Sequence, residues 1–93
     1  MTKNAATSVA PRQPPAPDVL VQGPAAAASY GPRVERDDGI VEPAWSAASA
    51  EFWSVYEWRT SKYAPEDGWW DWRADCDTEA TARSLAKAIA HGA

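Results

Sequence analysis

The sequence has few of the residues that build catalytic, metal-binding or cross-linked sites. There is one cysteine, Cys76, and one histidine, His91, in 93 residues. A single cysteine cannot form an internal disulfide, and no cluster of Cys and His has metal-ligand spacing. Cys76 falls on a predicted core face and His91 at a predicted helix end, so they make a poor nucleophile–base pair. We therefore expect no catalytic residue, no metal and no cofactor, and a protein that is not an enzyme.

Long apolar runs and an excess of basic charge are also lacking. No stretch approaches the roughly 18 apolar residues of a membrane span, and residues 1–7 lack the apolar core of a signal peptide. We therefore expect a cytoplasmic protein, away from membranes, with Cys76 reduced. The formal charge of −4 argues against general affinity for nucleic acid, which requires Lys and Arg against phosphate.

Proline and alanine dominate residues 1–38, and Tyr30 is the only aromatic residue there. Each proline fixes φ and removes a backbone donor, and a segment with so few aromatic side chains does not offset its own ordering entropy. We therefore predict a disordered arm over 1–38. The prolines are Pro11, Pro14, Pro15, Pro17, Pro24 and Pro32.

Two patterns within this arm suggest docking rather than a plain spacer. Val19, Leu20 and Val21 form a short β-prone apolar island, which suits addition as a strand to the sheet edge of a partner. Pro14 and Pro17 form a Pro-x-x-Pro pattern, although this pattern is common by chance in proline-rich chain. The alternatives of a spacer and a docking arm both stay open.

Residues 39–50 are a transition segment. Asp38-Gly39 is typical of a hairpin turn, and Val34 with Ile40-Val41 leaves room for a third strand. Pro43 precedes an Ala-rich run and suits the first position of a helix. We predict one or two helical turns here.

Residues 51–93 carry the pattern of a small ββα domain. Two aromatic-rich runs with period-two alternation, 52–59 and 69–76, predict strands, and the loop between them contains Pro65 and Asp67-Gly68. Thr78 or Asp77 is a candidate helix N-cap, and Gly92 a candidate stop. The predicted fold class is α+β: a β-hairpin or three-stranded sheet packed on one C-terminal helix. The predicted apolar stripe of that helix is Ala82, Leu85, Ala86 and Ile89.

Charge pairing suggests a register for the hairpin. With Trp58 opposite Trp72, Arg59 faces Asp71 and Glu57 faces Arg73, which gives two favourable cross-strand pairs. This register predicts a core face and an outer face for each strand. The predicted core residues are Phe52, Tyr56, Trp58, Trp70, Trp72, Ala74 and Cys76.

The outer face then carries Trp53, Val55 and Trp69 beside Arg59 and Arg73. Trp and Arg dominate binding hot spots, so we predict that these five residues form a partner-binding surface. The competing interpretation is that Trp45 and residues 44–50 fold back and cover this face.

A sheet that leads into a helix starting Asp77-Thr78-Glu79-Ala80 resembles the arm-binding domain of tyrosine recombinases over residues 51–91. The resemblance implies nucleic-acid binding by three strands with a basic face. Here the unit has eight acidic and five basic residues, a net charge of −3, which is unsuited to phosphate contact. We therefore do not assign that family, although Trp53 and Trp69 are suited to stacking on single-stranded bases.

The sequence as a whole predicts a small protein-binding, adaptor or inhibitor-like protein with a larger protein as its partner. The same kind of binding also allows a homodimer, in which the partner is a second copy of this chain. The alternative is a nucleic-acid-binding accessory protein. Salt separates the two classes, because affinity for nucleic acid falls steeply as salt rises.

Overall fold

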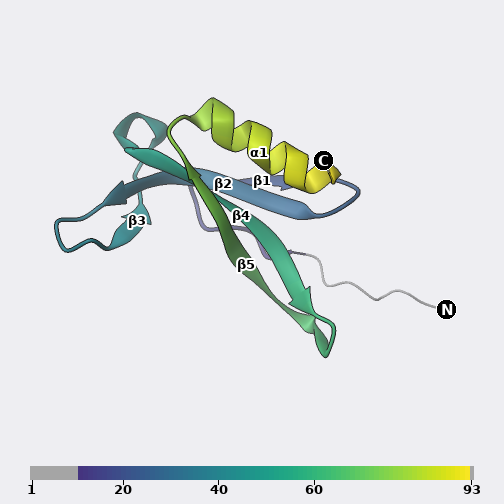
Figure 1. Cartoon of the computed structure of the whole chain (residues 1–93). Helices are drawn as coiled ribbons and strands as arrows, with labels where there is room; N and C mark the ends of the chain where they lie inside the picture. The colour runs from purple at the N-terminus through teal and green to yellow at the C-terminus, as the bar shows by residue number, and fades with distance from the viewer. Residues whose placement is uncertain (1–10, 93) are drawn as a thin grey trace.

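A computed structural model describes residues 11–92, apart from the side chain of Pro65. It shows an α+β fold in which a five-stranded antiparallel sheet packs against one C-terminal helix (Figure 1). The class is therefore as predicted, but the sheet is larger than a hairpin or three strands. The elements are β1 (Val19–Gln22), β2 (Ala27–Glu35), β3 (Val41–Pro43), the 3-10 turn η2 (Ala47–Ser49), β4 (Phe52–Ser61), β5 (Ala64–Cys76) and α1 (Glu79–His91).

The strand order is β1-β2-β4-β5, and β3 pairs with β2. Arg33 of β2 lies opposite Pro43 of β3 and opposite Phe52 of β4, so β3 and β4 flank β2 on its two edges. The long β2 thus holds β1 and β3, one after the other, along one edge. β4 and β5 form a long hairpin that extends beyond the helix (Figure 1).

The prediction of a disordered arm is wrong for residues 11–38; residues 1–10 lie outside the described part of the chain. β2 is a central strand of the sheet, with Ala28 and Tyr30 in the core. Proline was the misleading signal. Pro32 lies within β2 opposite Trp53, and its carbonyl accepts a hydrogen bond from the N–H of Ala44 at 3.0 Å. Proline is normally confined to edge strands and bulges, but here the paired residues on either side of Pro32 keep β2 in the sheet.

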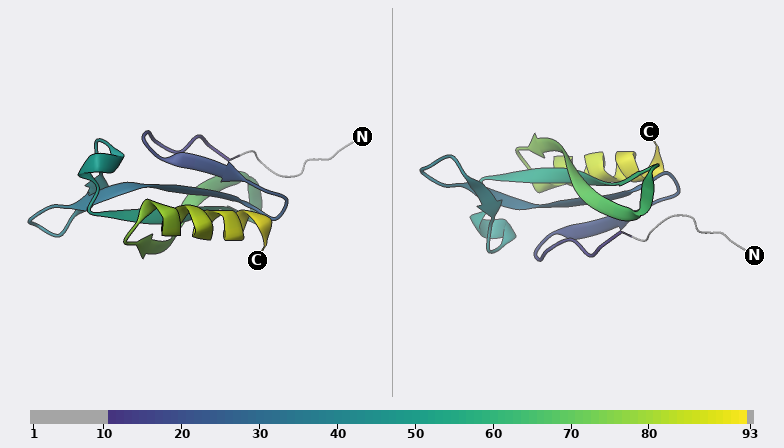
Figure 2. Two further views of the ribbon diagram at one scale, coloured as in Figure 1. Left: turned by 90° about the horizontal axis from the view of Figure 1, so that it is seen from above. Right: turned by 90° about the horizontal axis from the view of Figure 1, so that it is seen from below.

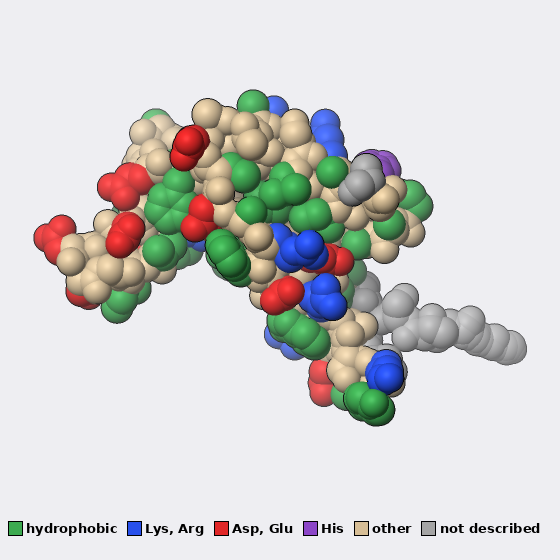
Figure 3. All heavy atoms as spheres, in the orientation of Figure 1, with side chains coloured by type: hydrophobic (Ala, Val, Ile, Leu, Met, Phe, Trp, Pro, Cys, Tyr) green, Lys and Arg blue, Asp and Glu red, His purple; other side chains and the backbone are tan. Residues whose placement is uncertain are grey.

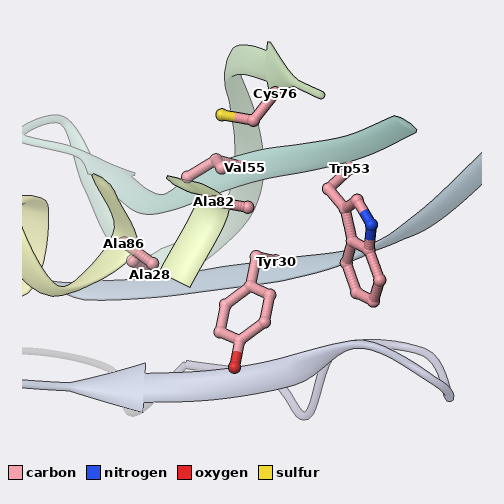
Figure 4. Close-up of a cluster of buried hydrophobic side chains, with 7 residues drawn as sticks. All are labelled: Ala28, Tyr30, Trp53, Val55, Cys76, Ala82 and Ala86. Atoms are coloured by element: carbon pink, nitrogen blue, oxygen red, sulfur yellow. The ribbon is translucent and has the colours of Figure 1, made fainter. Parts of the chain in front are cut away.

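α1 covers one face of the sheet as predicted. Thr78 is the N-cap, and its hydroxyl accepts a hydrogen bond from the N–H of Thr81; Gly92 ends the helix at φ 79° in the left-handed region that glycine tolerates. Small side chains on the buried stripe let the helix approach the sheet closely. The resulting core contains Ala28, Tyr30, Trp53, Val55, Cys76, Ala82 and Ala86 (Figure 4).

The structure reverses the predicted faces of β4. Trp53 and Val55, expected on the outer face, are 8 % and 0 % exposed and belong to the core under α1. Phe52, Tyr56 and Trp58, expected in the core, alternate with them on the other face and are only partly buried.

A bulge at Arg73 of β5 contributes to this error. The predicted register placed Trp58 opposite Trp72, whereas Trp58 lies opposite Trp70. The register shifts where Arg73 stands without a direct partner on β4, and one extra residue exchanges the two faces of a strand beyond it. Trp70 and Trp72 therefore leave the helix face that Cys76 keeps.

Residues 11–18, which we call the strap, cover part of the sheet face opposite α1. Seen edge-on, α1 and the segment that leads into β1 lie on opposite sides of the sheet (Figure 2). Pro14 of the strap is buried, and the guanidinium of Arg12 lies 5.7 Å from the ring centroid of Trp58. Trp45, which we considered as the cover of the outer face, is 97 % exposed. Intramolecular cover thus comes from the strap and not from residues 44–50.

The transition segment forms the predicted turn and third strand, but little helix. Gly39 donates a hydrogen bond to the carbonyl of Arg36 at 2.8 Å, and β3 follows. A single 3-10 turn, η2, stands where one or two helical turns were predicted. Within residues 11–92, no helix has the length and apolar character needed to cross a membrane.

Candidate functional site

The five residues predicted to bind a partner do not form one surface. Trp53 and Val55 lie in the core, so their assignment to a binding surface is wrong. Trp69 is 46 % exposed, and Arg59 and Arg73 are exposed as well. These three residues lie together on the part of the β4–β5 hairpin that α1 does not cover.

Charged side chains around Trp69 form a balanced network. Arg59 lies directly opposite Trp69, and its guanidinium is 3.7 Å from Glu57 Oε1 and 3.8 Å from Asp71 Oδ2. Arg73 also pairs with Glu57. The predicted pairs Arg59–Asp71 and Glu57–Arg73 therefore form, although diagonally rather than in the predicted register. Exposed pairs of this kind contribute about 0–1 kcal/mol each, so they orient the arginines more than they stabilise the fold.

Trp72 is the second exposed tryptophan of β5. Its side chain belongs to the face opposite Trp69, and the residue is 57 % exposed. The indole N–H donates to Asp75 Oδ1 at 3.0 Å, and the same oxygen accepts from Ser54 Oγ at 2.7 Å. This shared carboxylate fixes the orientation of an indole that otherwise faces solvent.

β5 is an edge strand with an unpaired outer edge. Within residues 11–92 it pairs with β4 alone, over most of its 13 residues. Such an edge presents free N–H and C=O groups to another chain. The hairpin carries acidic, basic and hydrophobic side chains interspersed on the helix side of the molecule (Figure 3). We call the outer edge of β5 and the exposed parts of its two faces, with Trp69, Arg59 and Arg73 on the one side and Trp72 on the other, the ribbon surface.

The predicted docking island, residues 19–21, forms β1 and adds to the edge of the chain's own sheet. Val19 lies opposite Tyr30, Leu20 opposite Ser29 and Val21 opposite Ala28. Val21 packs against the core, whereas Val19 is 42 % exposed. The β-prone pattern was correctly interpreted as a strand, and its pairing partner lies within the same chain.

A second site lies between the strap and the sheet, and the sequence analysis missed it. A cavity of about 280 Å³ opens there, lined by strap residues, by polar residues of β2 and by aromatic residues of β4 and β5. Its floor is a buried ion pair in which Arg33 donates to both carboxylate oxygens of Asp18, at 2.9 and 2.7 Å. The residues that line it are Pro14, Pro15, Asp18, Ser29, Arg33, Tyr56 and Trp70.

The environment of Arg33 holds it in the charged form. Burial opposes the charge, but hydrogen bonds to Asp18 and Tyr56 outweigh this effect and raise the pKa of Arg33. The guanidinium also lies 5.3 Å from the ring centroid of Tyr56, a cation–π distance. The charge of Arg33 is therefore paired with that of Asp18, and Arg33 is not available to bind a phosphate.

The residues with catalytic chemistry are not assembled. Cys76 is buried, and this burial, together with Asp75 and Asp77, raises the pKa of its thiol. A protonated thiol is a weak nucleophile. His91 is exposed in the last turn of α1. Among the described residues, no three His, Cys, Asp or Glu side chains are grouped so as to hold a metal ion.

Comparisons of this chain with protein-family models, with curated proteins and with solved structures find no match. The geometry of the ribbon surface and of the strap site is therefore the basis for a functional assignment.

Signals for the strap site are present in the sequence in hindsight. Asp18 and Arg33 are opposite charges that flank the β-prone segment 19–30, and Ala28, Tyr30 and Pro32 alternate with polar residues in a strand pattern. The proline content outweighed both signals in the sequence analysis.

Proposed function

We propose that the protein is a non-enzymatic binding protein that docks a larger protein through the ribbon surface. One observation carries the proposal: Trp69 and Trp72, both about half exposed, stand three residues apart on an unpaired edge strand beside Arg59 and Arg73. Trp and Arg are the residue types enriched in binding hot spots.

The edge and the side chains supply different parts of such an interface. Free backbone groups of β5 offer hydrogen bonds to an added strand, and the side chains on its two faces supply the specificity. The indole of Trp72 is held in place by Asp75, and Arg59 is held by Glu57 and Asp71. Groups that are already oriented lose less entropy on binding.

Nucleic acid is not favoured as the ligand of this surface. Arg59 and Arg73 are balanced by Glu57 and Asp71 at 4 Å or less, so the surface offers no net positive charge to a phosphate backbone. The proposal keeps the predicted cytoplasmic location.

The experiment compares proteins captured from a lysate of the source organism by three tagged full-length chains, with nuclease present. The chains are the wild type, Trp69→Ala/Trp72→Ala and Trp45→Ala. Trp45 is the matched control, because it is a tryptophan that is more exposed than either but lies away from the ribbon surface. Circular dichroism first confirms that each variant is folded.

The proposal predicts a protein that the wild type and Trp45→Ala retain and that the double variant loses. Its retention should change little between low and high salt, unlike the retention of nucleic acid. Identical captured sets for all three chains would show that the ribbon surface is not the docking surface.

A further inference from the structure

The sheet face opposite α1 carries an aromatic groove. Trp58 and Trp70 lie opposite each other on β4 and β5, with ring centroids 5.2 Å apart and planes at 68°. Tyr56 is the next residue on the same face of β4, and its ring lies beside Arg33. An edge-to-face contact is one of the preferred arrangements of two aromatic rings. We call Tyr56, Trp58 and Trp70 the aromatic groove.

The proline-rich strap is seated in this groove. Pro14 is buried, Pro14 and Pro15 line the same cavity as Tyr56 and Trp70, and Arg12 lies over the ring of Trp58. Proline rings in an aromatic-lined groove, with a basic residue at one end, are one of the recurring modes of peptide recognition. The other end of the segment is anchored by the two hydrogen bonds between Asp18 and Arg33.

The strap leaves part of the groove unsatisfied. A cavity of about 280 Å³ remains between strap and sheet. The indole Nε1 atoms of Trp58 and Trp70 are buried and have no hydrogen-bond acceptor among the described residues. Buried donors without partners cost free energy, and the strap, although it is proline-rich, brings no acceptor within hydrogen-bond distance of either one.

We propose that the aromatic groove is a binding site for proline-rich peptides of another protein, and that the strap occupies it in cis. The favoured peptide carries the pattern of residues 12–18: an arginine, then two adjacent prolines, a further proline and an acidic residue. The groove shares its face of the hairpin with Trp72 but not with Trp69 or Arg59, and the proposal does not depend on the function proposed for the ribbon surface. A tethered strap competes at an effective concentration in the millimolar range, so the intact strap acts as an intramolecular inhibitor.

The test is a peptide titration followed by NMR of the indole N–H groups in the full-length, ¹⁵N-labelled chain. The probe is a synthetic peptide with the sequence of residues 11–18, and the control peptide has alanine in place of its prolines. The chains are the wild type, Pro14→Ala/Pro15→Ala, which weakens the strap, and Lys87→Ala, which alters an exposed side chain of α1 on the other side of the sheet. Single Trp→Phe variants assign the indole signals.

The proposal predicts that Pro14→Ala/Pro15→Ala binds the peptide at least ten-fold more tightly than the wild type, while Lys87→Ala behaves as the wild type. The shifted signals should be those of Trp58 and Trp70, with that of Trp69, on the other face of β5, unchanged, and the control peptide should shift none. A shift of Trp69 without shifts of Trp58 and Trp70 would place the peptide on the ribbon surface and overturn the proposal.

Two further results would also overturn it. If millimolar peptide shifts neither Trp58 nor Trp70 in the folded double variant, the strap is a fixed part of the fold. If the wild type forms concentration-dependent dimers in which the straps are exchanged, the occupant is a second copy of this chain. Should the double variant fail to fold, Arg12→Ala takes its place, because it removes only the contact of an exposed side chain with Trp58. It should bind the peptide several-fold more tightly than the wild type, and unchanged binding would count against the proposal.

Discussion

Asp18 and Arg33 form a two-point ion pair that ties the strap to the central strand of the sheet. The side chains are 3 % and 6 % exposed, and both oxygens of the carboxylate accept from the guanidinium. The pair joins the strap, whose composition resembles that of disordered chain, to β2, which contributes Ala28 and Tyr30 to the core. Buried pairs of this kind mainly select one arrangement, and they become costly when one partner is lost.

Asp18→Ala should therefore destabilise the protein strongly. It leaves the charge of Arg33 buried and unpaired, and removal of one partner of such a pair costs about 3–5 kcal/mol. Urea denaturation followed by circular dichroism measures the free energy of unfolding. Arg36→Ala is the control, because its partner Asp38 is exposed and such pairs contribute about 0–1 kcal/mol. Equal losses in the two variants would contradict this account of the ion pair.

Gly31→Ala should displace the strap from the sheet. A methyl group on the Cα of Gly31 would overlap the carboxylate of Asp18, and overpacking of this kind costs about 1–3 kcal/mol. The same substitution in an Asp18→Ala background should cost less, because the overlapping group is gone. A double-mutant cycle measures the difference; additive losses would mean that the two residues do not touch.

Trp53→Ala and Trp69→Ala should differ sharply, although both tryptophans were predicted to lie on the same outer face. Trp53 is buried under α1 and contacts Tyr30 at a ring distance of 6.3 Å, so its loss should cost about 3–5 kcal/mol. Trp69→Ala should stay within about 1 kcal/mol of the wild type, as expected for an exposed site. Thermal unfolding of both variants tests this prediction. Similar melting temperatures would mean that Trp53 and Trp69 lie on the same exposed face, as the sequence predicted.

Cys76 should make stability depend on alkaline pH. Burial raises the pKa of its thiol above the ordinary value of 9.0, with Asp75 and Asp77 adding to the effect. The unfolded chain then ionises first, so this contribution to stability is present below pH 9 and is lost as the pH rises through the folded pKa. Between pH 7 and pH 10, the wild type should lose more free energy of unfolding than Cys76→Ala. Equal losses would show that the thiol is not shielded.

The C-terminal part of the fold was predictable because its signals are local. The cap at Thr78, the stop at Gly92 and the alanine stripe of α1 follow from helix geometry. The strands β4 and β5 follow from aromatic alternation. The N-terminal strands were missed because β2 is stabilised by partners on both edges, and its pairing with β4 joins residues as far apart in sequence as Ala28 and Glu57. Proline content does not reveal such pairing.

The binding surface was predictable only in part, because face assignment depends on register. Trp69, Arg59 and Arg73 are exposed as predicted, and the predicted ion pairs form. The sequence analysis assumed that side chains alternate between the two faces along the whole of each strand, and it inferred from this that Trp53 and Val55 are exposed. The bulge at Arg73 interrupts that alternation. A bulge leaves no signature in composition or periodicity, so the exchange of faces appears only in the structure.

Photo-crosslinking at position 69 is the most direct test of the ribbon surface as a docking surface. p-Benzoylphenylalanine replaces Trp69 in one chain and Trp45 in another, which keeps a large aromatic group at each exposed position. Each chain is irradiated in cells of the source organism. The account predicts a discrete adduct with a larger protein at position 69 and none at position 45. Adducts at position 45 alone, or at neither position, would contradict docking through the ribbon surface.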